Sequence, residues 1–376
     1  MTKHKSMPAE ASAIAIEMDR EPLLAPNTEV DSLHLQFERE NRRCLRHFVV
    51  LAAILLIIFA VSARLGRYPL ALSEIFRFIG ERIQGVERSQ SALKPEVYTV
   101  LLNIRLPRLL VCLMVGTALS VAGSAFQSIF NNPMVSPDVL GASSGAGLFA
   151  AMGILLGLPR ASLILCSFIG GLLSILVVLS ISRYLRFEPL LSLILTGMIV
   201  NSLFSACLSL LKYIADPNNE LPAITYWLMG SFSGVSRKDV GFVFWPVLIG
   251  TGIIIAYRWR LNLLSLGSDS AKSLGIHLKR DRAIILMAAT LLTAASVSVA
   301  GMISWVGLVI PHFAKIYVGA DHRRAIPAAA LMGAAFLLLV DDLARLLSTG
   351  EIPLGVLTAF VGAPIFLYLI FTEGRR

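Results

Sequence analysis

The sequence predicts an all-α protein that crosses a membrane about ten times, and three observations carry this prediction. Of its 376 residues, 56% are hydrophobic and only 15% are charged, whereas soluble domains carry about 25% charged residues. The mean hydropathy is +0.74. The apolar residues stand in continuous runs instead of alternating with polar ones, as the strands of a membrane β-barrel require. This pattern excludes a soluble enzyme, a disordered protein and a coiled coil.

Ten apolar runs are candidates for membrane-crossing helices. A helix needs about 20 apolar residues to cross the hydrocarbon layer of a bilayer. The eighth run is shorter than this and follows the seventh closely. The runs lie at approximately 48–63, 107–129, 139–158, 161–182, 189–211, 240–258, 283–303, 304–318, 326–347 and 353–371.

The first apolar run follows a long polar stretch. Residues 1–47 hold seven Lys/Arg and eight Asp/Glu, and a cleavable signal peptide would begin within the first few residues. The run at 48–63 is therefore predicted to be a retained signal-anchor. We expect a polar cytoplasmic tail at 1–47 and a membrane domain at 48–376.

The distribution of positive charge predicts the orientation of the chain. With the N-terminus inside, the internal segments contain 20 Lys/Arg and the external segments 13, and short cytoplasmic loops carry the excess of Lys/Arg. The segment between the first two runs is an exception with eight, but long translocated segments follow the rule less closely. Both termini are predicted to be cytoplasmic.

No motif for enzymatic chemistry is present. The sequence has no GxxxxGK[ST] phosphate-binding loop, no HExxH and no GxSxG. Its four cysteines form no CxxC pair, so neither a disulfide framework nor a zinc site is indicated. The net charge of +9 lies mostly in short loops, where it sets topology and contacts lipid headgroups, so no nucleic-acid partner is expected. We expect no catalytic, cofactor or metal site.

Five charged residues near the predicted outer surface are candidates for function. Asp341 and Arg345 are four residues apart on one helical face, so they can pair. With Asp342 they form either a structural ion pair, a proton relay or a docking charge for an external partner. Arg105 and Arg108 begin the second run, where they either anchor the helix at the interface by snorkelling or form an external rim for acidic residues.

Two connecting segments are unusual. The inner segment 259–282 has a spacing of Leu, Ala and Gly that predicts two short helices with a glycine break. Its apolar residues indicate either a protein-binding surface or an amphipathic helix on the membrane. The outer segment 220–236 is predicted to contain a short, non-spanning helix that caps a cavity.

Small residues and an internal echo indicate close packing and an inverted repeat. Residues 119–133 align without gaps with 297–311, sharing Ser-Val-Ala-Gly and a final Pro. The spans between them place the second copy in the opposite orientation, as in many transporters. Two GxxxG pairs predict close helix–helix contacts, and they are Gly141/Gly145 and Gly153/Gly157.

Six co-linear stretches together resemble the FecCD-type permeases, the membrane subunits of binding-protein-dependent ABC importers for ferric siderophores, haem and cobalamin. The resemblance implies a ten-helix subunit of a homodimer, with the path at the dimer interface, in the bacterial inner membrane. It also implies two cytoplasmic ATPase subunits, which would use the ATP, and an external substrate-binding protein. The stretches are RLPRLLVCLMVGTALSVAGSAFQSIFNNPMVSPDVLGASSGAG (105–147), YWLMGSFSGV (226–235), LLSLGSDSAKSLGI (263–276), VAGMISWVGLVIPH (299–312), GADHRRAIP (319–327) and DDLARLLSTGEIPLGVLTAFVGAPIFLYLI (341–370).

The resemblance carries three sets of site residues onto this chain. The family's docking arginines match Arg105, Arg108 and Arg345, and Asp342 departs from the usual apolar residue beside them. A possible cytoplasmic gate falls on Leu190 and Leu191, where a hydrophobic constriction would close by dewetting. The family's coupling-helix pattern LGxxxAxxLG, whose usual acid is here replaced by Ser268-Asp269, matches Leu266, Gly267, Ala271, Leu274 and Gly275.

The resemblance favours a permease that carries an iron(III) chelate, either a siderophore or haem, with cobalamin as the alternative substrate. A second class of function is a proton-coupled secondary transporter that uses Asp341 or Asp342, for which the pattern at 263–276 would have no purpose. A third class is a membrane receptor or scaffold without transport. Neither alternative requires a partner ATPase.

Overall fold

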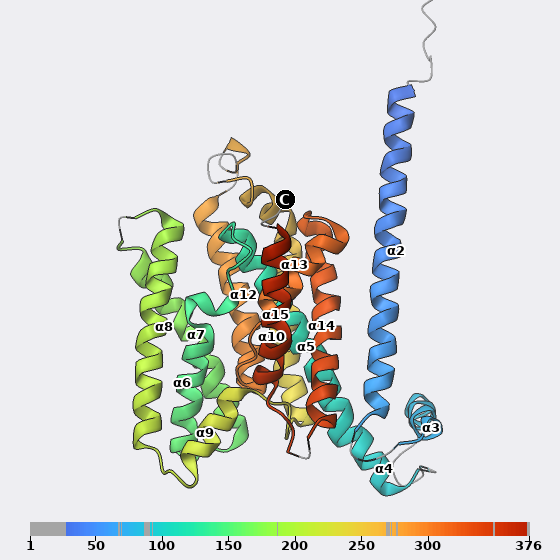
Figure 1. The fold of residues 1–376 in the computed structure, drawn as a ribbon, viewed down its shortest axis with the longest axis vertical. Helices are drawn as coiled ribbons and strands as arrows, with labels where there is room; N and C mark the ends of the chain where they lie inside the picture. The colour runs from blue at the N-terminus through green and yellow to red at the C-terminus, as the bar shows by residue number, and fades with distance from the viewer. Residues whose placement is uncertain are drawn as a thin grey trace, which may run out of the picture. The chain divides into compact units, whose positions relative to one another are not determined.

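The computed structural model describes residues 28–66, 68, 70–85, 91, 93–185, 187–267, 271, 273–275, 277–348 and 350–373. The chain divides into two units, residues 1–47 and 48–376, and regular structure in the described residues is helical throughout (Figure 1). The elements are α2 Thr28–Arg64, α3 Leu72–Ile83, α4 Pro95–Thr99, π-helix η2 Val100–Arg105, α5 Leu106–Ile129, 3₁₀-helix η3 Pro137–Leu140, α6 Ala142–Leu155, α7 Arg160–Ser182, α8 Pro189–Ile214, α9 Glu220–Met229, α10 Arg237–Leu264, α12 Leu278–Ala300, α13 Val306–Val318, α14 His322–Leu346 and α15 Leu354–Glu373.

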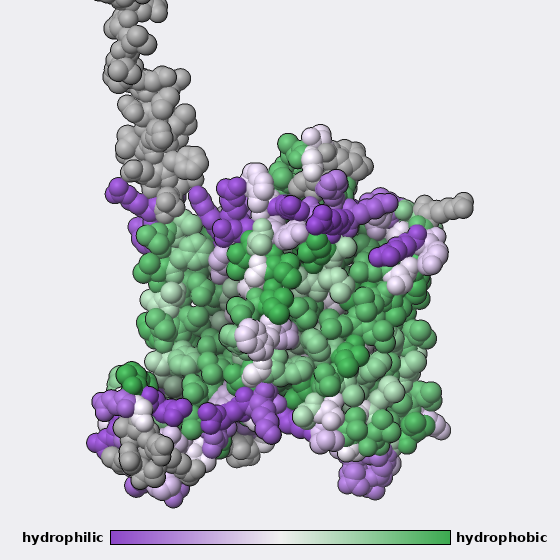
Figure 2. Space-filling model, turned by 180° about the vertical axis from the view of Figure 1, so that it is seen from behind, coloured by the Kyte–Doolittle hydropathy of each residue, from purple (hydrophilic) through white to green (hydrophobic). Residues whose placement is uncertain are grey.

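The predicted all-α, multi-span fold is confirmed in the described part of the chain. Seven helical segments are long and apolar enough to cross a membrane, and the apolar helices Ala142–Leu155, Val306–Val318 and Leu354–Leu369 are shorter. The surface of residues 48–376 shows a broad apolar band between two polar rims (Figure 2). This pattern is what a bilayer requires, because lipid tails cannot solvate charged side chains.

Several predicted spans differ in length from the helices observed, among them the sixth, predicted at 240–258, which is the 28-residue α10. The second begins at Pro95 instead of 107, because residues 95–105 continue the helix through the π-helical turn of η2. The third and eighth are cut to 14 and 13 residues. Gly141, with φ +74°, separates η3 from α6, and Gly301, with φ +70°, ends α12 before the short α13.

Helices α5 and α12 form the centre of the bundle, because most of the residues in each of them are buried. Small residues let α5 approach its neighbours backbone to backbone. A Cβ added at Gly123 would lie 1.8 Å from the carbonyl oxygen of Gly307 on α13, and one at Gly116 would lie 2.3 Å from that of Gly333 on α14. The core is thus held by helix packing through small residues.

The two predicted GxxxG pairs have different outcomes. Gly145 packs against α7, since an added Cβ would lie 2.6 Å from the carbonyl oxygen of Gly170. Gly157 has φ +62° in the turn after α6, and nothing lies within 4 Å of its Cβ position. The prediction of helix packing was wrong for Gly157, which ends a helix.

The bundle has two ends that the sites below refer to. The α3 end holds α3, α4, α9, the start of α10 and the end of α14 (Figure 1). The α12 end holds the described residues of the segment 265–277 and the starts of α12 and α14. Helices α5 and α12 run in opposite directions, and each is followed by an irregular stretch and a short helix. This arrangement agrees with the inverted echo in the sequence.

Candidate functional site

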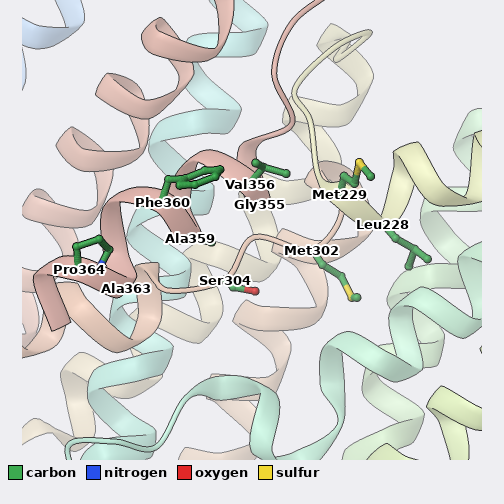
Figure 3. Close-up of a pocket in the computed structure, with 10 residues that line it drawn as sticks. All are labelled: Leu228, Met229, Met302, Ser304, Gly355, Val356, Ala359, Phe360, Ala363 and Pro364. Carbon is green, nitrogen blue, oxygen red and sulfur yellow. The ribbon is translucent and has the colours of Figure 1, made fainter. Parts of the chain in front are cut away.

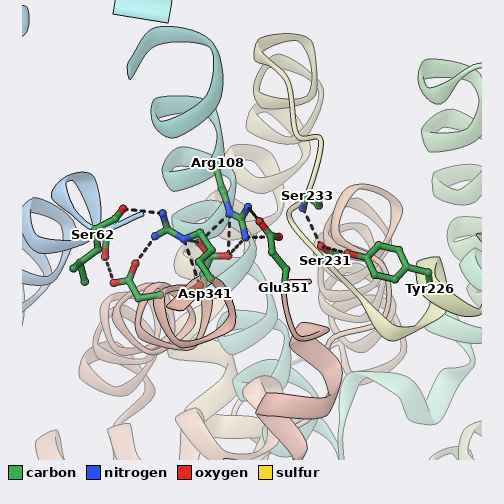
Figure 4. A network of polar contacts seen from close by, with 10 residues as sticks. Ser62, Arg108, Tyr226, Ser231, Ser233, Asp341 and Glu351 are labelled. Carbon is green, nitrogen blue, oxygen red and sulfur yellow. Dashed lines mark hydrogen bonds and ion pairs between the residues drawn. The ribbon is translucent and has the colours of Figure 1, made fainter. Parts of the chain in front are cut away.

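A buried ion-pair cluster lies at the α3 end and consists of Arg108, Asp341, Asp342, Arg345 and Glu351 (Figure 4). Arg108 on α5 donates to Asp341 on α14, with Nη2 and Oδ1 2.8 Å apart. It also donates to both carboxylate oxygens of Glu351, at 3.0 and 3.1 Å. One guanidinium therefore joins α5 both to α14 and to the connection between α14 and α15.

Arg345 holds the other side of the cluster. Its Nε lies 3.1 Å from Oδ2 of Asp341, which confirms the pair predicted from their spacing. It also pairs with Asp342 and donates to the carbonyl oxygen of Leu65 at 3.1 Å. The Ser62 hydroxyl of α2 donates to Asp342 at 2.5 Å. Ion pairs and hydrogen bonds thus connect helices α2, α5 and α14 at the α3 end of the bundle.

Arg105 caps the end of α2. Its guanidinium donates to the carbonyl oxygens of Ala63 at 2.6 Å, Arg64 at 2.8 Å, and Tyr68. The last carbonyls of a helix have no partner within the helix, so this contact satisfies part of that end. Arg105 also lies within electrostatic range of Asp342 and Arg345. If Arg105 is included in the cluster, its three arginines carry a charge equal and opposite to that of its three carboxylates.

The three predicted docking arginines are buried in this structure. The exposed fractions are 5% for Arg105 and 9% for each of Arg108 and Arg345. Charges at this depth are costly unless they are paired and hydrogen-bonded, and each guanidinium here is engaged by groups of the same chain. Sequence reasoning missed Glu351 and Ser62, which no motif or helical spacing connects to the arginines.

A cavity of about 650 Å³ lies beside α9 and α15 (Figure 3). Met229 of α9, Met302 of the break after α12, and Phe360 of α15 line it, and the Ser304 hydroxyl is polar. An added Cβ at Gly355 would lie 2.7 Å from the carbonyl oxygen of Met229, so α15 packs closely on the end of α9. The short helix predicted in 220–236 is observed as α9, and Leu228 and Met229 at its end line the cavity; the predicted capping of a cavity stays a prediction.

The predicted coupling residues lie at the α12 end. Leu266 and Leu274 are 62% and 58% exposed, while Ala271 is fully buried. Gly267 and Gly275 have φ of +99° and +81°, where glycine is favoured. Two apolar side chains are thus presented outward by a segment with turns at both glycines. Ser268 and Asp269 lie outside the described residues.

The base of this segment is tied to α5 and α14 by a polar network that sequence reasoning missed. The Asn262 side-chain oxygen accepts from the backbone amide of His322 at 2.8 Å, and its amide donates to Asp321 at 2.6 Å. The His322 ring contacts the Ser128 hydroxyl at the end of α5. Burial raises the pKa of Asp321, but the hydrogen bonds and the nearby arginines outweigh it and hold that pKa below its usual value.

The predicted gate residues occupy the first turn of α8. The Glu188 carboxylate caps this helix by accepting from the backbone amides of Leu190 at 2.9 Å and Leu191 at 3.1 Å. Leu191 is 45% exposed and Leu190 is half-buried against the core. Both leucines therefore lie at the α12 end of the bundle, where α8 begins.

Within the described residues, no group of three His, Cys, Asp or Glu side chains is placed to hold a metal ion. The four cysteines are not joined by disulfides. In the described part of the chain, two further ion pairs lie outside the cluster and the Asn262 network, namely Arg160 with Asp239 and Arg260 with Asp281.

Comparison with known proteins agrees with this architecture. The chain is 38% identical to the molybdate import system permease protein MolB of Haemophilus influenzae, over 86% of this chain and 95% of the relative. It is 36% identical to the hemin transport system permease protein HmuU of Yersinia pestis, again over 86% and 95%. A solved inward-facing structure, described as of the metal-chelate ABC transporter type, matches with a TM-score of 0.76 at 37% identity, covering 86% of this chain and 98% of the other.

Residues 54–372 match the FecCD transport family across nearly the whole membrane domain. The relatives are permeases of import systems, and the fold is that of a solved member of the metal-chelate type. The chain belongs to the FecCD transport family, as a multi-pass permease subunit of an ABC importer of metal chelates that is not itself an enzyme.

Proposed function

We propose that this permease carries an iron(III) chelate, a siderophore or haem, across the bacterial inner membrane. The observation that carries the substrate class is the lining of the cavity beside α9 and α15, which is apolar apart from the hydroxyl of Ser304. A bulky chelate with an organic shell suits such a wall. A bare oxyanion such as molybdate would need hydrogen-bond donors or positive charge there. Cobalamin, which is also bulky, is the alternative.

The energy for transport comes from partner chains in this proposal. Two ATPase subunits in the cytoplasm bind and hydrolyse ATP, and two copies of this chain form the path between them. Residues 1–47 form a cytoplasmic tail, residues 48–376 the permease domain, and both termini lie in the cytoplasm, as the Lys/Arg count favours. The α12 end then faces the ATPases and the α3 end faces outward.

The exposed leucines of the segment 265–277 suit the ATPase contact. Leu266 and Leu274 project from the α12 end, and apolar side chains buried in a groove on a partner are the usual centre of a protein interface. We assign Gly267, Ala271 and Gly275 to shaping this segment. Leu190 and Leu191 then stand at the cytoplasmic mouth as a hydrophobic gate.

Docking of the binding protein is proposed at the α3 end, around Arg105, Arg108 and Arg345. Because their guanidinium groups already contact this chain, acids of the binding protein would share or compete for them. The same contacts weigh against proton coupling through Asp341 or Asp342, since both carboxylates are held by arginines.

The test is uptake by iron-starved cells that lack their other ferric permeases and express this chain with its ATPase and binding protein. We expect uptake of a radiolabelled ferric siderophore or of haem iron, and loss of uptake when the ATPase is inactivated. Uptake of labelled cobalamin or molybdate alone would contradict the iron assignment. Uptake that survives loss of the ATPase but stops with a protonophore would contradict the ATP-driven mechanism.

A further inference from the structure

A second cavity, of about 510 Å³, lies at the α3 end between α3, α5 and α10. We call it the α3 groove. Its volume is within the range of about 300–1,000 Å³ usual for ligand sites. Its floor is apolar and includes Phe78 of α3, Leu106 and Leu110 of α5, and Val240 of α10. Nothing in the transport mechanism above uses this groove.

Two arginines stand in the lining of the α3 groove. Arg82 lies in the last turn of α3 and Arg237 is the first residue of α10. Both side chains are exposed, and neither forms an ion pair with a residue that the structure describes. Two cations at the rim of an apolar floor are complementary to a ligand with an anionic head and an apolar body.

The acids on the same helices are engaged elsewhere. Glu74 accepts from the backbone amide of Ala71 at 2.9 Å, and Glu81 accepts from the Ser91 hydroxyl at 2.5 Å. On α10, Asp239 pairs with Arg160 at 3.1 Å. Among the described residues, no acid is therefore paired with the two arginines of the groove, and their charge is available to an anionic ligand.

The groove lies where a bilayer surface meets the bundle. Leu110 and Val240 belong to membrane-spanning segments, whereas Arg237 begins its span. Helix α3 exposes large apolar side chains as well, with Phe76 71% and Ile83 80% exposed, as in helices that lie in a membrane interface. At this end the polar rim borders the apolar band directly (Figure 2).

We propose that the α3 groove binds one anionic glycerophospholipid, with its phosphate at Arg82 and Arg237 and acyl carbons on the apolar floor. Guanidinium groups bind phosphate oxygens through paired, charge-assisted hydrogen bonds. The lipid seals the gap between α3 and the bundle on the outer leaflet side of the proposed topology. By holding α3 against α5, it steadies the end at which the binding protein is proposed to dock.

The test is a lipid titration of the purified full chain in neutral detergent, followed by native mass spectrometry. The probes are palmitoyl-oleoyl phosphatidylglycerol and the matching phosphatidylcholine, with glycerol phosphate as a competitor that lacks acyl chains. We expect one phosphatidylglycerol per chain to bind more tightly than phosphatidylcholine. Arg82→Gln/Arg237→Gln should weaken that binding by about 30-fold, because each of the two basic residues contributes about 1 kcal/mol towards an anionic lipid and about 1.4 kcal/mol corresponds to a factor of ten.

The matched control is Arg77→Gln/Lys238→Gln, which removes the same charge from the same two helices outside the groove lining. It should leave phosphatidylglycerol binding within about twofold. Equal loss in both double variants would overturn the proposal, since only net charge would then matter. Displacement of the lipid by glycerol phosphate alone, or equal binding of phosphatidylcholine, would overturn it too.

A second pair of variants tests the apolar floor. Val240→Trp fills the groove, whereas Leu248→Trp places the same ring two turns further along α10, at a site that is 51% exposed and outside the lining. Val240→Trp should weaken binding of phosphatidylglycerol by about tenfold, as expected for displaced acyl contacts. Retention of full affinity by Val240→Trp would overturn the placement of the acyl chain.

Discussion

Arg108 is the residue on which the ion-pair cluster depends. Asp341 is fully buried and relies on Arg108 and Arg345 for counter-charge. We predict that Arg108→Gln lowers the free energy of unfolding by about 3–5 kcal/mol, because removing one member of a buried pair leaves an uncompensated charge. Thermal unfolding in detergent measures this loss.

The control for that variant is Glu351→Gln. Its side chain is 18% exposed, and the pair between Arg108 and Asp341 survives the change. The expected loss is about 1.5 kcal/mol, smaller than for Arg108→Gln, because the side-chain oxygen of the glutamine can still accept a hydrogen bond from Arg108. If Arg108→Gln unfolded at the wild-type temperature, the cluster would have no role in stability, and direct docking by a free guanidinium would gain support.

Gly123 sets the distance between α5 and α13. A Cβ there would fall 1.8 Å from a backbone carbonyl oxygen, and backbone cannot swing aside as a side chain can. We predict that Gly123→Ala destabilises the fold by about 3 kcal/mol or more, beyond the usual range of overpacking. Gly241→Ala on α10, where nothing lies within 4 Å of the Cβ position, should unfold at or slightly above the wild-type temperature.

At the scale of single residues, local spacing predicts the ion pairs of Arg345 within α14, with Asp341 and Asp342, but not the contacts between helices. The pair of Asp341 and Arg345 follows from four-residue spacing within one helix. The pair of Arg108 and Asp341 joins residues 233 positions apart. It depends on the register between α5 and α14, which the contact of Gly116 with Gly333 determines, and no single-helix pattern contains that register.

Among the elements, the segment 265–277 has the clearest consequence for assembly. We predict that Leu266→Ser/Leu274→Ser weakens binding of the ATPase subunit by tenfold or more, because each buried leucine contributes about 1.5–3 kcal/mol. The unfolding temperature of the permease itself should not change, since both side chains are more than half exposed. Co-purification with the ATPase measures the effect.

The control uses two exposed leucines at the opposite end of the bundle. Leu346 and Leu347 are 53% and 61% exposed at the end of α14. Leu346→Ser/Leu347→Ser should retain the ATPase at the wild-type level. Equal loss of the ATPase in both double variants would point to a general effect of detergent or fold, and would remove the coupling role from the segment.

Element boundaries are predicted well where apolar runs end at charges, and poorly where they end at backbone breaks. The run at 161–182 closely matches α7 because Arg160 and Arg183 flank it. The run at 139–158 contains no charged residue, yet Gly141 in a left-handed conformation limits α6 to 14 residues. Hydropathy indicates which residues can lie in lipid, but it contains no information about the backbone angle φ at which a helix begins or ends.

At the scale of the whole molecule, the number of Lys/Arg residues in each loop predicts in part which segments lie at the same end of the bundle. The Lys/Arg distribution predicts which loops share a side, and the structure places the end of α10 and the start of α14 together. The sequence predicts a cavity near 220–236, but the lining of neither cavity could be predicted, because each is formed by residues from three or more elements. Their walls depend on tertiary packing that hydropathy does not encode.

The cavity beside α9 and α15 also bears on assembly. Phe360 and Pro364 of α15 line it, and Phe360 is 75% exposed. An open, apolar wall on one copy can become one side of a closed path when a second copy covers it. The proposed homodimer therefore places α15 towards the partner, and not towards lipid.

Cross-linking tests this placement. In a background where the three native cysteines that are not fully buried, Cys44, Cys166 and Cys207, are replaced by alanine, we predict that Phe360→Cys joins two copies through a short bismaleimide. Leu56→Cys on α2, 69% exposed, should not, because an equally apolar side chain on a lipid-facing helix meets no second copy. Cross-linking at Leu56 in place of Phe360 would move the interface to α2. The cavity would then open to lipid, and it could not be part of a shared path.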